Sequence, residues 1–180
     1  LDITKQPLGD RRLLIPRGGT IQVPSESVVV ASRQDPMAVI DSVLGREQTR
    51  GGTKRFRVQQ SGTMFQVIPE RFIDASGLWQ DALPILDTTV TISHRDVSLM
   101  DFVQLLCAEI SVVRSETVKP GSTLIAVALR TKVPAQERTA PARRLLEDAI
   151  SAAGVPLTWL LFYAPDTKDY ALNVVPPGRF

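Results

Sequence analysis

The chain has little of the chemistry on which catalysis or metal binding usually depends. Its 180 residues include one cysteine, Cys107, and one histidine, His94. A single cysteine excludes an intramolecular disulfide bond, and one histidine with one cysteine cannot supply the several ligands of a structural metal site. Aromatic residues make up only 6% of the chain, so its core must rest on Val, Leu, Ile and Ala. We expect no cofactor and no metal.

Charge and hydropathy exclude further classes of protein. The chain has 21 Lys and Arg residues against 19 Asp and Glu, and its net charge of +2 is too small to indicate a nucleic-acid or membrane-surface partner. No apolar run approaches the roughly 18 residues of a membrane-spanning helix. With 43% hydrophobic and 22% charged residues, the composition is typical of a globular protein. Because the chain begins at Leu1, export after removal of a signal peptide is permitted.

One unit occurs twice along the chain: a short helix, then a two-stranded hairpin that ends on Val-Ile-Pro or Val-Val-Pro. Asp35 and Pro36 suit the N-cap and the first helical position of the first copy. Apolar spacing predicts the helices, and alternation predicts the strands. The predicted helix and strands occupy residues 37–44, 54–58 and 63–68 in the first copy, and residues 144–150, 157–163 and 170–175 in the last.

Residues from 88 onwards predict the order β-α-β-β-α-β-β. Residues 89–92 alternate as in a half-buried strand. Ser98 with Asp101 three residues later is similar to a capping box and predicts the start of a helix. The apolar stripe of this helix consists of Leu99, Phe102, Val103, Leu106 and Ile110. Predicted strands at residues 111–114 and 123–129 follow, and then a polar loop at residues 132–140.

These elements predict an α+β fold with two lobes of small mixed β-sheets packed against helices. The first lobe covers residues 1–72 and contains the first helix and hairpin. The pattern of residues 73–87 predicts a linker that packs against the rest of the protein and contains one helical turn. The second lobe covers residues 88–180.

Two stretches of the second lobe resemble a known family. Residues 93–103 read Ser-His-Arg-Asp-Val-Ser-Leu-Met-Asp-Phe-Val, and residues 144–159 end in Gly-Val-Pro-Leu-Thr-Trp. With the order of elements, residues 88–177 resemble the short N-terminal domain of secretins and TonB-dependent transporters. The resemblance implies a protein-interaction domain in the bacterial cell envelope, and it supplies no catalytic residues.

The candidate binding residues form one basic cluster on the first hairpin. They are Arg46, Arg50, Lys54, Arg55 and Arg57. Basic residues beside an aromatic such as Phe56 can bind single-stranded nucleic acid or another anionic ligand. Alternation favours a solvated hairpin face, with Arg55 and Arg57 outward and Phe56 and Val58 inward.

The residues around the other reactive side chains predict that these side chains have structural roles. Cys107 is flanked by Leu105, Leu106 and Ala108, which indicates a small buried hydrophobe and not an exposed thiolate nucleophile. Glu147 and Asp148 are neighbours on a predicted helix and point in different directions, so they do not form an acid–base pair.

The sequence favours a non-catalytic protein–protein interaction module of the bacterial cell envelope. We expect the second lobe to bind an unidentified partner through a sheet edge or a helix face. The expected location is periplasmic or secreted, and a cytoplasmic location stays open. The alternative is a ligand- or nucleic-acid-binding protein that uses the basic cluster between residues 46 and 57. An enzyme ranks third, because the sequence presents no catalytic set.

Overall fold

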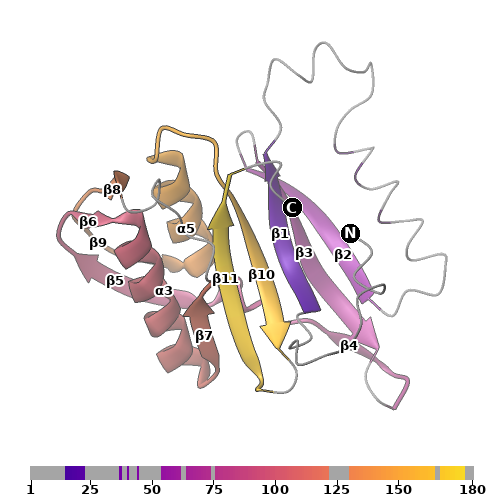
Figure 1. The fold of residues 1–180 in the computed structure, drawn as a ribbon. Coiled ribbons are helices and arrows are strands. Elements are labelled where there is room, and N and C mark those ends of the chain that lie inside the picture. Colours follow the sequence, from indigo (N-terminus) through magenta and orange to yellow (C-terminus); the bar gives the residue numbers. More distant parts are fainter. Residues whose placement is uncertain are drawn as a thin grey trace, which may run out of the picture.

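A computed structural model confirms the α+β class (Figure 1). The structure describes residues 15–22, 37, 40, 44, 54–61, 64–73, 76–121, 130–164 and 167–176. Helices α3 (Leu99–Arg114) and α5 (Ala142–Ser151) lie between a large β-sheet and two small ones. Both helices bury their apolar faces in one common core.

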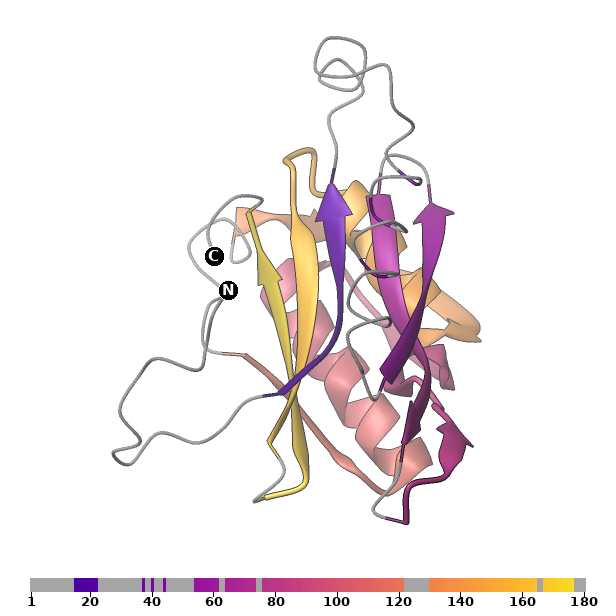
Figure 2. The same ribbon diagram turned by 90° about the vertical axis from the view of Figure 1, so that its right-hand side faces the viewer.

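One sheet of seven strands runs through both halves of the chain. Its order is β2-β3-β1-β10-β11-β7, and β4 pairs with β3. Because β1 pairs with both β3 and β10, the two predicted lobes share this sheet (Figure 2). The strands are β1 (Ile15–Gln22), β2 (Lys54–Ser61), β3 (Met64–Ile73), β4 (Trp79–Asp81), β7 (Thr117–Pro120), β10 (Thr158–Ala164) and β11 (Asp169–Val175).

The small elements cover the other side of the helices. β5 (Thr89–His94) pairs antiparallel with β9 (Gln136–Pro141), and β6 (Val97–Ser98) pairs with β8 (Lys132–Val133). A 3-10 turn, η2 (Ile85–Asp87), precedes β5. Among the described residues, and apart from the two-residue strands β6 and β8, the order from β5 to β11 is β-α-β-β-α-β-β.

The start and the end of α3 follow from local chemistry. The Ser98 hydroxyl accepts a hydrogen bond from the Asp101 backbone N–H at 3.1 Å, as the predicted capping box requires. The helix ends where Ser115 adopts a left-handed conformation with φ 53°. Residues 111–114 are therefore helical, and the strand predicted there is wrong. The exposed Val112 and Val113 favour a strand locally, but the buried helical face decides their conformation.

The polar loop predicted at residues 132–140 is also wrong, because it contains β8 and most of β9. In β9 only Ala140 is buried, so its sequence is nearly as polar as that of a loop. The helical turn predicted within residues 73–87 corresponds to η2. Strands predicted at residues 27–31 and 123–129 lie outside the described residues.

Both predicted hairpins are confirmed, as β2–β3 and as β10–β11. The last predicted helix is α5. In the first predicted helix, Met37, Ile40 and Leu44 are helical and half-buried, and the residues between them lie outside the described part of the chain.

Candidate functional site

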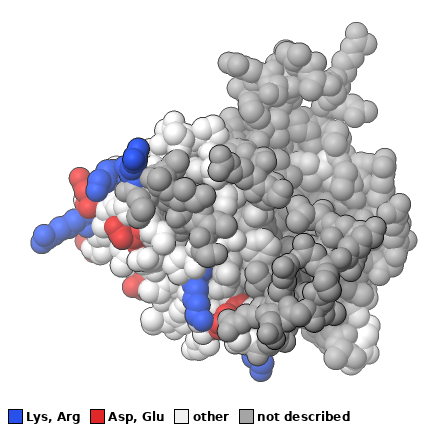
Figure 3. Space-filling view, in the orientation of Figure 1, with Lys and Arg blue, Asp and Glu red and all other residues white. Residues whose placement is uncertain are grey.

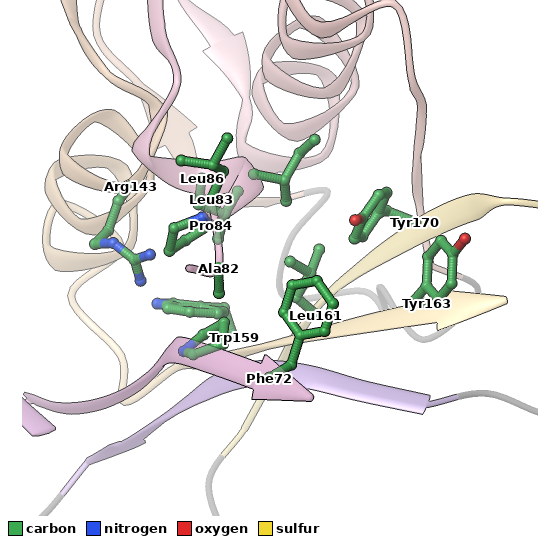
Figure 4. Close-up of a pocket in the computed structure, with 12 residues that line it drawn as sticks. Phe72, Ala82, Leu83, Pro84, Leu86, Arg143, Trp159, Leu161, Tyr163 and Tyr170 are labelled. Carbon is green, nitrogen blue, oxygen red and sulfur yellow. The ribbon is translucent and has the colours of Figure 1, made fainter. Parts of the chain in front are cut away.

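Along one edge of β3, the strand that pairs with it changes from β1 to β4. β1 pairs with β3 as far as Val67, whereas β4 pairs with it only from Arg71 onwards. After β4 the Ala82 N–H donates to the Glu70 carbonyl at 2.7 Å. The chain then passes over the sheet into η2, and a cavity remains between this segment and the sheet (Figure 4).

This apolar cavity has a volume of about 190 Å³ and is lined mainly by aromatic and aliphatic side chains. Leu83 is 74% exposed, whereas Trp159 is 1% exposed, so the cavity runs from the surface into the core. Tyr163 and Tyr170, from adjacent strands, lie with their ring centroids 5.0 Å apart along one side. The lining also includes Phe72, Pro84, Leu86 and Leu161.

A buried guanidinium stands at the inner end of the apolar cavity. Arg143 is 7% exposed, and its side chain points toward the indole of Trp159, 5.3 Å from the ring centroid (Figure 4). Its Nε donates to Asp87 Oδ1 at 2.6 Å, and its Nη1 donates to Gln66 Oε1 at 3.1 Å. Such partners are needed because an unpaired buried charge is costly.

Gln66 links this arginine to a buried carboxylate on the same helix. Gln66 is fully buried, and its Nε2 donates to Glu147 Oε1. The Ser61 hydroxyl donates to Glu147 Oε2 at 2.8 Å. Arg143 and Glu147 are four residues apart, which puts both on the side of α5 that faces β2 and β3. The four polar side chains thus fasten the helix to the first hairpin.

A second, polar cavity of about 240 Å³ lies next to these groups. Arg143 lines both cavities. The polar cavity is lined by Arg57, Gln59, Ser61, Asp87, Pro141, Arg143, Arg144 and Glu147.

Two residues of the predicted basic cluster have described contacts, and these contacts differ. Arg46 and Arg50 lie outside the described residues, and Lys54 begins β2 without a described side chain. The Arg55 guanidinium lies 4.8 Å from the ring centroid of Trp79. Arg57 Nη2 instead lies 3.5 Å from Asp87 Oδ2, at the polar cavity.

The alternation predicted for β2 is present, although the two arginines have different contacts. A β-bulge lies opposite this part of β2, because Phe56 pairs with Pro69 but Arg55 pairs with Arg71. The extra residue of the bulge belongs to β3, so alternation along β2 itself continues. Arg55 and Arg57 are exposed and Phe56 and Val58 are half-buried, as predicted.

Arg55 shares Trp79 with a second arginine. The Arg71 guanidinium lies 5.8 Å from the same ring centroid, and its Nε lies 3.1 Å from Asp81 Oδ1. Elsewhere on the described surface, basic and acidic side chains are interspersed, as Figure 3 shows for one face.

The remaining reactive groups have the structural roles that the sequence predicts. Cys107 is buried, and desolvation raises the pKa of its thiol to about 12, which removes the thiolate at neutral pH. Asp148 does not join Glu147, and its carboxylate binds Arg138 at 2.5 Å. The His94 ring packs edge-on against Phe102. Within the described ranges, no group of three or more His, Cys, Asp or Glu side chains is placed to hold a metal ion.

One of the polar contacts has a local signal in the sequence, and the others have none. Arg143 and Glu147 have the spacing of a helical ion pair, and they flank the apolar stripe of α5. Their common partner Gln66 is 81 residues away from Glu147 in the chain, and no local pattern reveals such a contact.

No family model, curated protein or solved structure matches the chain. In the part of the chain that the structure describes, no helix has the length and hydropathy needed to span a membrane. Function must therefore be inferred from the two cavities and the elements that build them.

Proposed function

We propose that this protein is a non-catalytic module that binds another protein by taking one of its apolar side chains into the apolar cavity. The observation that carries the proposal is an apolar opening that begins at the exposed Leu83 and ends on the buried ring of Trp159. Interface cores are enriched in aromatic residues, and the strongest contacts occupy well-packed pockets.

The size of the cavity favours a side chain over a free small molecule. Small-molecule sites usually occupy about 300–1,000 Å³. The apolar cavity, at about 190 Å³, is smaller than this range. One leucine or aromatic side chain of a partner suits such a volume, and contacts around the rim then exclude water from it.

The cavity is also held in shape before any partner arrives. Arg143 supports its inner end and is itself fixed by Asp87 on one side and Gln66 on the other. A wall that is already ordered loses little conformational entropy on binding. This pre-organisation supports a binding role.

The proposed location is the bacterial cell envelope. The resemblance of residues 88–177 to the short N-terminal domain of secretins and TonB-dependent transporters supports this part of the proposal. The capped helix α3, the helix α5 and the closing hairpin β10–β11 lie where the resemblance places its two helices and its hairpin.

A second candidate is binding of an anionic ligand or single-stranded nucleic acid by the first hairpin. It is favoured by Trp79, whose ring lies against the guanidiniums of Arg55 and Arg71. This candidate predicts oligonucleotide binding that weakens steeply with salt, and Arg55→Gln should reduce that binding.

Site-specific photo-crosslinking tests the main proposal. A benzoylphenylalanine placed at Leu83, expressed in the native host, is expected to capture one partner, to be identified by mass spectrometry. The control carries the same group at Val112 on α3, where the side chain is 76% exposed compared with 74% for Leu83. The partner is then purified and its binding to the unmodified chain measured.

Capture from Leu83 but not from Val112, followed by saturable binding of the purified partner, supports the proposal. Equal capture from both positions, or no binding by the purified partner, contradicts it.

A further inference from the structure

Two arginines share one aspartate at the edge of the polar cavity. Asp87 Oδ1 accepts from Arg143 Nε at 2.6 Å, and Asp87 Oδ2 lies 3.5 Å from Arg57 Nη2. The first contact is short and its arginine is buried, so Asp87 mainly balances Arg143. The Arg57 side chain is 50% exposed, and its contact with Asp87 is the longer of the two.

A second aspartate, Asp148 on α5, is also shared by two arginines. Asp148 Oδ2 accepts from Arg138 at 2.5 Å, and Asp148 Oδ1 lies 3.3 Å from Arg144 Nε. The Arg144 side chain is 57% exposed and has the longer of the two contacts. Arg144 lines the polar cavity, and Arg138 is outside its lining.

The third carboxylate does not compensate these charges directly. Glu147 accepts its hydrogen bonds from Ser61 and Gln66, which are both neutral donors. The lining of the polar cavity therefore contains three guanidiniums against two carboxylates. Two of the three guanidiniums, on Arg57 and Arg144, are exposed and loosely paired.

The position of Arg143 and Arg144 near the helix N-terminus also favours a bound anion. Arg143 and Arg144 belong to the first turn of α5, which contains no acidic residue, and Pro141 provides no side-chain cap. A helix N-terminus carries partial positive charge, so cations are unfavourable there and anions are favourable. An anion in the polar cavity would offset this unfavourable arrangement.

We infer that the polar cavity binds an oxyanion, a carboxylate or a phosphate group, between the guanidiniums of Arg57 and Arg144. Charge-assisted hydrogen bonds from guanidinium groups to such anions are among the stronger contacts available. The Ser61 hydroxyl lies in the same lining as a further polar group. This site is separate from the apolar cavity, and Arg143 lies between the two.

The test is an NMR titration of the full chain with sodium phosphate, and separately with sodium acetate, against sodium chloride at matched ionic strength. Saturable shifts of the Arg57 and Arg144 side-chain Nε–H signals are expected. The double variant Arg57→Gln with Arg144→Gln should bind about tenfold more weakly or worse. Because both side chains are half-exposed, its melting temperature should stay close to that of the wild type.

Arg138→Gln is the matched control, because Arg138 binds the same aspartate as Arg144 but does not line the cavity. Its phosphate affinity should change less than twofold. Shifts that fail to saturate, or an equal loss in Arg138→Gln, would overturn the inference.

Binding of acetate alone points to a carboxylate-bearing ligand, binding of phosphate alone points to a phosphate group, and binding of both shows a site open to either; each of these results supports an oxyanion site. Leu83→Asp should leave phosphate binding unchanged, so this test and the test of the apolar cavity can fail separately.

Discussion

Helices α3 and α5 contribute to one core but bury different kinds of side chain. α3 buries only apolar side chains, among them Phe102, Leu106 and Cys107. α5 buries apolar side chains too, but it also buries Arg143 and Glu147. Burial of α3 thus contributes the transfer free energy of its apolar surface to stability. Burial of α5 does so too, but it also carries the cost of removing two charges from water.

This difference separates the part of the molecule that builds the fold from the part that shapes its cavities. Buried charges often add little net stability compared with apolar residues of the same volume. What Arg143 and Glu147 do provide is position: they hold Gln66 and Asp87 and form walls of the polar cavity. We therefore expect α3 variants to affect folding and variants around α5 to affect binding as well.

The largest effect should come from the apolar helix. Phe102 is fully buried, so Phe102→Ala should lower the free energy of unfolding by about 3–5 kcal/mol. Urea denaturation of both proteins measures this loss. The exposed variant Gln104→Ala on the same helix is the control and should change stability very little. A loss for Phe102→Ala below about 1 kcal/mol would mean that α3 does not anchor the core.

A smaller loss should follow from a change in the polar contacts of α5. Glu147→Ala leaves the buried Gln66 amide and the Ser61 hydroxyl without their acceptor, and should cost about 2–3 kcal/mol. Glu147→Gln keeps one side-chain oxygen as an acceptor and should cost less. Equal stability of Glu147→Ala and the wild type in urea denaturation would show that these hydrogen bonds contribute nothing.

Local signals explain which parts of the fold the sequence predicts. The cap at Ser98 and the apolar stripe of α3 are read directly from adjacent residues, and both are confirmed. The sequence does not predict β9, because four of its six side chains are exposed and the β5 residues that pair with it are 42 to 52 positions away.

The candidate site depended on contacts between distant residues. Arg55 lies against Trp79 of β4 and Arg57 lies near Asp87 of η2, and alternation along β2 alone does not reveal these contacts. The apolar cavity forms only where β1 gives way to β4 and β10 lies alongside. Periodicity describes one element at a time, so it predicts neither feature.

The pH dependence of stability tests the burial of Cys107 in α3. Cys107→Ala should cost on the order of 1 kcal/mol and should leave binding intact. Burial raises the folded-state pKa to about 12 from the usual 9.0, so the thiol's stabilising contribution is full below pH 9.0 and is lost as pH rises toward 12. The stability difference between the wild type and Cys107→Ala should therefore narrow in alkaline urea denaturations. Rapid labelling of the native thiol at pH 8 would contradict its burial.

The smallest effects should come from the exposed arginines of β2. Arg55→Gln and Arg57→Gln should each change stability by less than about 1 kcal/mol, because exposed charges contribute little. The two variants should differ spectroscopically. Arg55→Gln removes a guanidinium from the Trp79 ring and should alter tryptophan fluorescence, whereas Arg57→Gln should alter it much less. Identical fluorescence changes would mean that Arg55 does not lie against the Trp79 ring.

The most direct test of the division between the two regions compares Leu83→Asp with Val112→Asp in binding to the partner identified by crosslinking. The two positions are 74% and 76% exposed, so folding should tolerate both changes about equally. Isothermal titration should show an affinity at least about tenfold weaker for Leu83→Asp and an unchanged affinity for Val112→Asp. Equal affinities for the two variants, or a loss confined to Val112→Asp, would contradict a binding surface at the apolar cavity.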